Sequence, residues 1–263
     1  MSRTQSISKS PLDGVRVVVT RAVEQASSLA RTLAEAGAQV ESLPLIEVVP
    51  PSNPRPLARA ASELALYDWV VFTSANGVRA LLGQAEGSLP ASLSAATVGR
   101  ATTKALRAHG IEAQLTSEKS DAEGLLAELA PKVAQKRVLL PQAADARPLL
   151  AQGLAAAGAD VTVVVAYEKR MPPGVSARAA KLFSGGPVGW VTFTSAGLAR
   201  RFAGLFAEEW ESRRLELLAA SIGPVTSREL RALGLEPAAE ATRPGDAELV
   251  AAIVGRVATT RAA

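Results

Sequence analysis

"VVFTSANGV" at residues 70–78 decides the fold of this chain, because a related stretch, "VTFTSAGLA", returns at residues 191–199. In both stretches an apolar run passes directly into Thr and Ser and then into a helical pattern. A short Val-rich run is typical of a strand that is covered on both faces of its sheet. The two stretches therefore predict two equivalent strands, each ending in small polar residues where a helix begins.

The surrounding sequence repeats in the same order as these two stretches. The aligned pairs are residues 15–45 with 136–166, Phe72 with Phe193, 96–113 with 220–237, and 121–129 with 246–253. Self-similarity over such long segments indicates that each half of the chain contains the same series of strand–helix units.

Strands that alternate with helices indicate parallel sheets with right-handed crossovers. Two copies of the series predict an α/β protein with two such lobes. Pro-rich stretches at 43–56 and 161–174 occupy corresponding positions in the two halves, and each begins as a strand. We expect these stretches to pair with each other and to connect the lobes.

The composition excludes several kinds of chemistry. The chain of 263 residues is 48% hydrophobic and 4% aromatic, and it has no cysteine and one histidine, His109. Disulfides, thiolate catalysis, zinc-thiolate sites and multi-histidine metal sites are excluded, so we expect no metal site of these kinds. The low aromatic content argues against a base-stacking nucleic-acid surface. His109 precedes Gly110 near the expected end of a helix, where the dipole favours a structural role.

The charged residues are dispersed along the chain, with a net charge of +4. This charge suits a polyanionic small ligand, although it also suits ordinary solubility. The polar start at residues 1–14 has no apolar core of a signal peptide, and no apolar run reaches membrane-spanning length. We therefore expect a cytoplasmic protein without membrane contacts, and a disordered start of about ten residues.

Small polar residues follow the predicted strands at the edge where open parallel sheets bind ligands. Helix starts there present free backbone N–H groups and partial positive charge. The sequence thus predicts a cleft for a ligand with several carboxylates or phosphates; the alternative at any one position is a simple helix cap. The residues concerned are Thr20, Arg21, Thr73, Ser74, Ala75, Asn76, Gly99, Arg100, Thr194, Ser195, Gly223 and Pro224.

Familiar catalytic motifs do not account for these positions. The chain contains neither the dinucleotide-binding Gly-rich fingerprint nor a P-loop. "FTSAG" at 193–197 resembles a nucleophile elbow, but one histidine and the mirrored Ser74 argue against acyl transfer. Tyr167 lies in "VVVAYEKR", at the end of the strand that opens the second Pro-rich stretch, where its phenol could donate a proton to a leaving hydroxyl. The alternative for Tyr167 is an amphipathic side chain packed at a hinge.

In this order and spacing, the motifs resemble the uroporphyrinogen-III synthase family over about residues 15–255. The resemblance implies two flavodoxin-like lobes with parallel sheets, joined by a two-stranded linker, with a ligand cleft between the lobes. The implied boundaries are 1–42 plus 173–263 for lobe one, 53–162 for lobe two, and 43–52 with 163–172 for the linker strands. The motifs span 17–50, 70–78, 98–110, 120–129, 137–170, 191–202, 221–234 and 246–253.

The family implies cyclisation of hydroxymethylbilane, a linear tetrapyrrole, to uroporphyrinogen III with inversion of the D ring and loss of water. No cofactor is required. Each pyrrole of the substrate carries an acetate and a propionate, which fits the polycarboxylate expected at the strand ends. We also expect a monomer that receives its substrate in a transient handover from hydroxymethylbilane synthase.

Residue by residue, the resemblance makes Tyr167 the group that assists departure of the hydroxide. It also implies that Arg147 is a retained substrate contact and that Arg100 is an added one. Gln142-Ala143 departs from the Arg-Gly pair of many relatives. Other positions that match the lining of the family's cleft are Arg21, Thr73, Ser74, Thr102, Ser195 and Thr226.

The competing hypothesis is a non-enzymatic two-lobe protein that binds a small polycarboxylate. Such sensors also have two α/β lobes and a hinge, but they usually carry an export signal or a DNA-binding domain. A repeat scaffold without a ligand would leave the polar strand ends unexplained.

Overall fold

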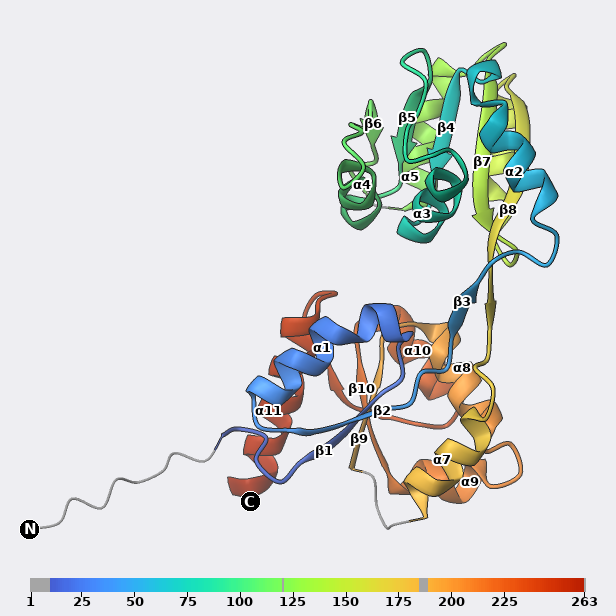
Figure 1. The fold of residues 1–263 in the computed structure, drawn as a ribbon. Coiled ribbons are helices and arrows are strands. Elements are labelled where there is room, and N and C mark those ends of the chain that lie inside the picture. Colours follow the sequence, from blue (N-terminus) through green and yellow to red (C-terminus); the bar gives the residue numbers. More distant parts are fainter. Residues whose placement is uncertain (1–9, 120, 185–188, 263) are drawn as a thin grey trace, which may run out of the picture. The chain divides into compact units, whose positions relative to one another are not determined.

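The chain forms two compact lobes in the computed structural model, which describes residues 10–119, 121–184 and 189–262 (Figure 1). Lobe one combines the two ends of the chain, Met1–Glu47 and Met171–Ala263, and lobe two is the continuous segment Val48–Arg170 between them. The start of the chain that was expected to be disordered lies outside the described residues, apart from Ser10.

Lobe one is built on a five-stranded sheet with the spatial order β2-β1-β9-β10-β11, and all of its neighbouring strands are parallel. Numbered along the lobe, this order is 2-1-3-4-5, the flavodoxin-like arrangement. The order reverses between β1 and β9, and at such a reversal open sheets bind ligands. The strands are β1 (Arg16–Val19), β2 (Gln39–Ser42), β9 (Gly189–Phe193), β10 (Leu217–Ser221) and β11 (Pro237–Glu240).

The helices of lobe one cover both faces of this sheet (Figure 1). One face buries Phe193 with Phe202 and the other buries Leu29 and Leu33 with Leu249. The helices are α1 (Val23–Glu35), α7 (Val175–Phe183), α8 (Ala196–Leu205), α9 (Trp210–Arg213), α10 (Pro224–Ala232) and α11 (Asp246–Ala262), with a 3-10 turn at Arg214–Glu216.

Lobe two has a six-stranded sheet with the order β3-β8-β7-β4-β5-β6, and the neighbouring strands from β8 to β6 are parallel. If β7 and β8 are counted first, the order is again 2-1-3-4-5, with β3 added beyond β8. The strands are β3 (Glu47–Val49), β4 (Trp69–Phe72), β5 (Ser94–Thr97), β6 (Leu115–Thr116), β7 (Arg137–Ala143) and β8 (Asp160–Arg170).

The sheet of lobe two likewise separates two apolar clusters, one around Phe72 and Leu81 and the other around Leu125 and Leu140. The helices are α2 (Arg55–Ser62), α3 (Ala75–Gln84), α4 (Arg100–Arg107), α5 (Ala122–Leu129) and α6 (Leu149–Ala156), with 3-10 turns at Leu64–Leu66 and Ala130–Lys132.

The internal repeat corresponds to equivalent strand–helix–strand units in the two sheets. The unit β1-α1-β2 of lobe one and the unit β7-α6-β8 of lobe two occupy the same positions in their sheets. In lobe one this unit comes first along the chain, whereas in lobe two it comes last, so the second sheet is a circular permutation of the first. The prediction of two α/β lobes with parallel sheets is confirmed.

The two Phe-Thr-Ser-Ala stretches form matching strand-to-helix turns. Phe72 and Phe193 are fully buried, and Ser74 and Ser195 cap the helices α3 and α8. The two turns differ in how closely the first turn of the helix approaches a neighbouring strand. A Cβ on Gly77 would lie 2.9 Å from the Pro141 carbonyl oxygen, so the start of α3 packs directly on the backbone of β7.

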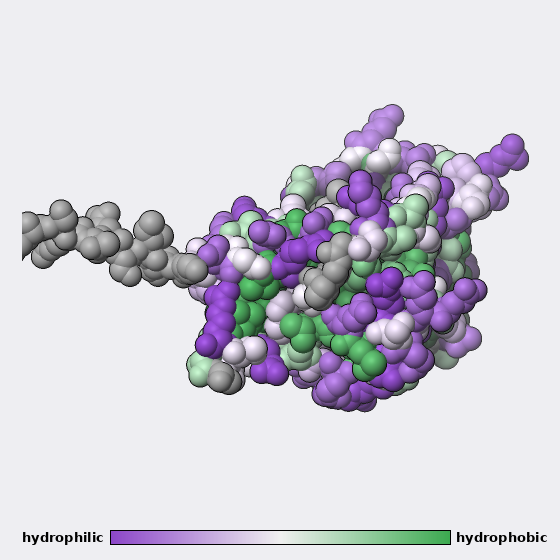
Figure 2. All heavy atoms as spheres, turned by 90° about the horizontal axis from the view of Figure 1, so that it is seen from below, coloured by the Kyte–Doolittle hydropathy of each residue, from purple (hydrophilic) through white to green (hydrophobic). Residues whose placement is uncertain are grey.

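Figure 2 shows hydrophilic residues spread over the visible face, with hydrophobic residues exposed between them in smaller areas. This distribution agrees with the dispersed charge of the sequence. Within the described ranges, the helices include none that is both long and apolar enough to cross a bilayer.

Candidate functional site

The end of β4 in lobe two brings two predicted site residues into contact. The Ser74 hydroxyl oxygen accepts a hydrogen bond from the Gly77 amide at 3.1 Å. The same oxygen lies 3.0 Å from the Tyr167 phenolic oxygen, and either hydroxyl can be the donor. Tyr167 comes from β8, two strands away from β4 in the sheet order. The two residues, 93 positions apart in the chain, therefore form one hydrogen-bonded unit at the start of α3.

A β-bulge determines where Tyr167 points. The register between β7 and β8 shifts after Gln142, so that Gln142 pairs with Val165 but Ala143 pairs with Tyr167. Val163 and Val165 are exposed, whereas Ala166 and Tyr167 are both buried. Regular alternation would have placed Tyr167 on the same face as Val165. The extra residue of β8 instead turns the phenol onto the face of the sheet that carries α3.

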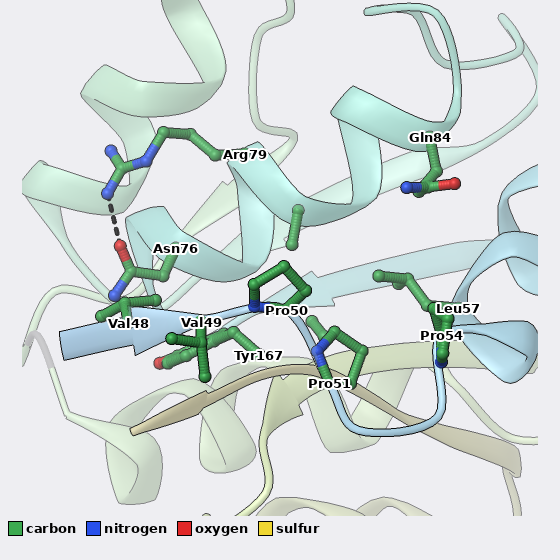
Figure 3. A pocket seen from close by; sticks show the side chains of 12 residues that line it. Val48, Val49, Pro50, Pro51, Pro54, Leu57, Asn76, Arg79, Gln84 and Tyr167 are labelled. Atoms are coloured by element: carbon green, nitrogen blue, oxygen red, sulfur yellow. Dashed lines mark hydrogen bonds between the residues drawn. The ribbon is translucent and has the colours of Figure 1, made fainter. Parts of the chain in front are cut away.

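A pocket of about 310 Å³ adjoins this pair within lobe two (Figure 3). Arg79 donates a hydrogen bond to the Asn76 side-chain oxygen at one part of the pocket, and Gln84 lies further along the same helix. Most of the remaining lining is apolar, so the pocket combines an apolar surface with a few polar groups. The lining residues are Val48, Val49, Pro50, Pro51, Pro54, Leu57, Asn76, Arg79, Ala80, Gln84, Ala166 and Tyr167.

The Pro-rich side of the pocket is attached to β8 through Glu168. The Glu168 carboxylate accepts hydrogen bonds from the Ser52 amide at 2.6 Å and from the Ser52 hydroxyl at 2.9 Å. The amide bond, and secondly the hydroxyl bond, hold the pKa of Glu168 below its ordinary value, because both stabilise the charged form. Glu168 follows Tyr167 directly, so this contact connects the pocket wall to the strand that carries the phenol.

We expect the attachment to be pH-dependent. A lowered folded-state pKa means that ionised Glu168 stabilises the fold above its unfolded pKa of about 4.3. That stabilisation is lost as the pH falls through the lower, folded-state value. An NMR titration that follows the Ser52 amide should therefore show a midpoint below the ordinary pKa of a glutamate.

The Ser52→Ala variant separates the two causes, because it removes the hydroxyl and keeps the amide. Since the amide is the larger cause, we expect Ser52→Ala to move the Glu168 midpoint only part of the way back to its ordinary value. A full return would show that the hydroxyl, and not the amide, dominates.

The other predicted residues of lobe two lie at separate places. Gly99 precedes α4 in an extended conformation, and its carbonyl accepts the Thr102 amide at 2.9 Å. Arg100 is exposed, whereas Thr102 is buried. Arg147 pairs with Glu123 at 3.1 Å, and both side chains are exposed. No contact brings these residues to the Ser74–Tyr167 pair among the described parts of the chain.

In lobe one, two of the predicted residues have internal partners. Thr20 is fully buried and donates to the Thr192 carbonyl at 2.7 Å. Arg21 forms an ion pair with Asp246 at 2.7 Å, with both side chains mostly buried. A ligand carboxylate would have to compete with Asp246 for this guanidinium.

The remaining predicted residues of lobe one lie at two helix starts. Ser195 caps α8 by accepting the Leu198 amide at 3.3 Å. The Gly223 amide donates to the Ser221 hydroxyl at 3.2 Å at the start of α10, where Thr226 is buried. Ser195 thus repeats the cap of Ser74 without a tyrosine partner of its own among the described residues.

Sequence reasoning missed Arg79, Ser52 and Glu168. Arg79 could have been found, because it lies three residues after Asn76 and therefore on the same side of the helix. The contact between Ser52 and Glu168 has no local signal, since the two residues are far apart in the chain. Within the described ranges, no group of three His, Cys, Asp or Glu side chains could hold a metal ion.

The chain belongs to the class of two-lobe α/β proteins, because it has two flavodoxin-type lobes with matching helix starts at their strand ends.

The family model described as "Uroporphyrinogen-III synthase HemD" matches residues 27–251. Uroporphyrinogen-III synthase of Synechococcus elongatus is 34% identical over 230 residues, covering 84% of this chain and 87% of the relative. A putative uroporphyrinogen-III synthase of Methanothermobacter thermautotrophicus is 29% identical, covering 83% of this chain and 90% of the relative.

Two solved structures share the fold at 20% identity. A mutant uroporphyrinogen III synthase of Thermus thermophilus gives a TM-score of 0.64, covering 93% of this chain and 99% of that chain. Uroporphyrinogen-III synthetase of Helicobacter pylori gives 0.63, covering 92% and 99%. The chain belongs to the uroporphyrinogen-III synthase family, which consists of enzymes of tetrapyrrole biosynthesis. The competing hypothesis of a non-enzymatic binding protein is not favoured.

Proposed function

We propose that this chain cyclises hydroxymethylbilane to uroporphyrinogen III, with inversion of the D ring and loss of one water. Family membership supports the reaction class. The observation in the structure that carries the proposal is the hydrogen bond between the Tyr167 phenol and the Ser74 hydroxyl. It supports a proton donor held in a fixed position, which is what departure of a hydroxyl group needs.

The Ser74–Tyr167 pair can act as a chain of hydrogen bonds. The Gly77 amide donates to Ser74, and the Ser74 hydroxyl then donates to the phenolic oxygen of Tyr167. In that arrangement the phenolic proton is free to point at the substrate. The positive end of α3 polarises the Ser74 hydroxyl, and successive hydrogen bonds strengthen one another. Each bond in the chain stabilises the negative charge that develops on Tyr167 as it gives up its proton.

The proposed chemistry begins at the ring-A hydroxymethyl carbon. Its bond to the hydroxyl breaks, and the hydroxyl leaves as water with the proton of Tyr167. The pyrrole nitrogen supplies the electron pair, which gives an azafulvene in its protonated form. Ring D attacks through its substituted carbon and forms a spiro intermediate. Rearrangement and closure release one proton, which restores the phenol.

Most of the rate advantage in this proposal comes from orientation, because the linear substrate can also close without help to the uninverted isomer. Holding one conformation of a flexible chain is the kind of task that positioned hydrogen-bond donors perform. We propose that the predicted strand-end residues with exposed or partly exposed groups contact the substrate carboxylates. They are Arg21, Thr73, Asn76, Gly99, Arg100, Arg147 and Ser195. In this proposal the buried Thr20, Thr102, Gly223 and Thr226 hold the strand ends in position.

We further propose that the enzyme works as a cytoplasmic monomer and receives its unstable substrate by a transient handover from hydroxymethylbilane synthase. Sedimentation of the purified chain, alone and mixed with that synthase, tests both points. A stable dimer of the chain would contradict the monomer.

The two matching serines allow a specific prediction. Ser74→Ala and Ser195→Ala each remove a helix cap, at a cost of about 1 kcal/mol in stability. Only Ser74 also contacts Tyr167. We expect Ser74→Ala to lower the turnover rate about tenfold, as loss of a hydrogen bond to a developing charge does. Ser195→Ala should act mainly on KM, and equal turnover rates for both variants would contradict a positioning role for Ser74.

The proposed function is tested by mixing the purified chain with freshly prepared hydroxymethylbilane and separating the product isomers. We expect the type III isomer in excess over a blank without protein. A product mixture that contains only the type I isomer, as in the blank, would refute the enzyme.

A further inference from the structure

The pocket beside Tyr167 is larger and more apolar than the departure of a hydroxyl group alone requires. Its volume of about 310 Å³ is at the lower end of small-molecule sites, which begin near 300 Å³. Val48 and Val49 of β3, Ala80 of α3 and Ala166 of β8 give it an apolar surface. Such a surface fits a flat, apolar ring better than it fits a free carboxylate.

Arg79 supplies a cation at this pocket. Its side chain is exposed, and one guanidinium nitrogen donates to the Asn76 side-chain oxygen. In Figure 3 the two side chains converge at one part of the pocket, and the dashed line marks their hydrogen bond. This bond fixes the direction of the guanidinium and leaves most of its five N–H groups for another acceptor.

Two other arginines of the lobe, in contrast to Arg79, are paired with carboxylates. Arg59 pairs with Glu63 at 3.1 Å and Arg107 pairs with Glu112 at 3.0 Å. Within the described ranges, no carboxylate forms an ion pair with Arg79. A planar carboxylate from a ligand can therefore bind the guanidinium through two parallel hydrogen bonds, without displacing an internal ion pair.

We propose that this pocket is a subsite for one pyrrole ring of the substrate, in which Arg79 binds a carboxylate side chain of that ring. The choice of a pyrrole rests on the proposed function. Because Tyr167 lines the same pocket, the ring in question is the one that carries the departing hydroxyl. The apolar residues contact the ring, and Arg79 fixes its orientation relative to the phenol.

Binding is tested with a single pyrrole that carries one acetate and one propionate, titrated into the full ¹⁵N-labelled chain. We expect saturable NMR shifts at the amides of Val49, Ala80 and Ala166. The dimethyl ester of the same pyrrole should bind about fivefold more weakly, as loss of one exposed charge pair predicts. Shifts at other residues only, or equal affinity for acid and ester, would overturn the subsite.

Two matched variants assign the effect to Arg79. Arg79→Gln and Arg107→Gln remove the same charge from exposed positions of lobe two, and neither is expected to disturb the fold. Arg79→Gln should abolish the preference for the acid over the ester, whereas Arg107→Gln should retain it. Arg79→Lys keeps the charge without the planar fork and should give an intermediate preference. Identical preferences for all three variants would overturn the role of Arg79.

Turnover kinetics distinguish this subsite from the proposed function. With the bilane substrate, Arg79→Gln should raise KM about fivefold relative to Arg107→Gln, with little change in kcat, because a binding contact is lost. If the native chain forms the type III isomer and the two variants have equal KM values, the subsite is wrong and the function stands. If the native chain forms only the type I isomer but binds the pyrrole through Arg79, the subsite is supported and the proposed function is refuted.

Discussion

Replacing Tyr167 with Phe should lower the rate of type III formation about 100-fold, the lower end of what a positioned general acid contributes. The substitution removes the phenolic oxygen 3.0 Å from Ser74 and leaves the buried ring in place. The fold should lose no more than about 1 kcal/mol, the net value of one hydrogen bond. Because the bilane also closes unaided, the type I fraction of the product should rise as the enzymatic rate falls.

Tyr67 provides the matched control for this experiment. It is the other tyrosine of the chain, it is 7% exposed against 6% for Tyr167, and it lies in the same lobe. Its ring faces the Arg137 guanidinium at 5.5 Å and does not line the pocket. Tyr67→Phe should keep the native rate and isomer ratio. If Tyr167→Phe also keeps both, Tyr167 has no part in the chemistry and another proton donor must be sought.

Replacing Phe202 with Ala should destabilise lobe one by about 3–5 kcal/mol. Phe202 is fully buried in α8 and lies at the centre of an aromatic cluster. Its ring centroid is 5.4 Å from that of Phe193 and 5.3 Å from that of Phe206. Truncation leaves a cavity and removes several edge-to-face contacts, each of which adds about 0.5–1.5 kcal/mol beyond the buried area.

Hydrogen exchange of peptides measures this loss lobe by lobe. A cost of about 3 kcal/mol should speed exchange in β9 and α8 by more than about 100-fold. Strands β4 and β7 should keep their rates, because the described cores of lobe two contain only residues of lobe two. Val225→Ala, at a side chain that is 61% exposed, serves as the control and should stay within about 0.5 kcal/mol. Equal acceleration in both lobes would contradict separate cores.

The repeat made the fold predictable from the sequence. Once "VVFTSANGV" and "VTFTSAGLA" are aligned, the strands that precede Thr73 and Thr194 follow, and so do the helices behind them. The Val-rich runs need apolar cover on both faces, so their strands must lie inside a sheet that is covered by helices. Short strands that alternate with helices are compatible with few arrangements other than parallel sheets. The predicted lobe boundaries and linker strands depend on the conformation of the connecting segments, and they stay a prediction.

The site was less predictable, because its geometry depends on contacts between distant segments. The β-bulge at Gln142 and Ala143 has no signature in the local sequence, yet it decides that Tyr167 faces Ser74. The ion pair between Arg21 and Asp246 joins opposite ends of the chain and is equally invisible to periodicity. The sequence showed which residue types lie at the strand ends, but it did not show their hydrogen-bond and ion-pair partners.

The permuted topology also has a consequence for how the protein is made. Strand β1 lies between β2 and β9, and β9 begins only at Gly189, so it is synthesised after all of lobe two. The nascent chain therefore carries an incomplete sheet at its front while the continuous segment Val48–Arg170 can already fold. The last lobe to be completed is the one that was started first, and its exposed strand edge must be kept from pairing elsewhere until translation ends.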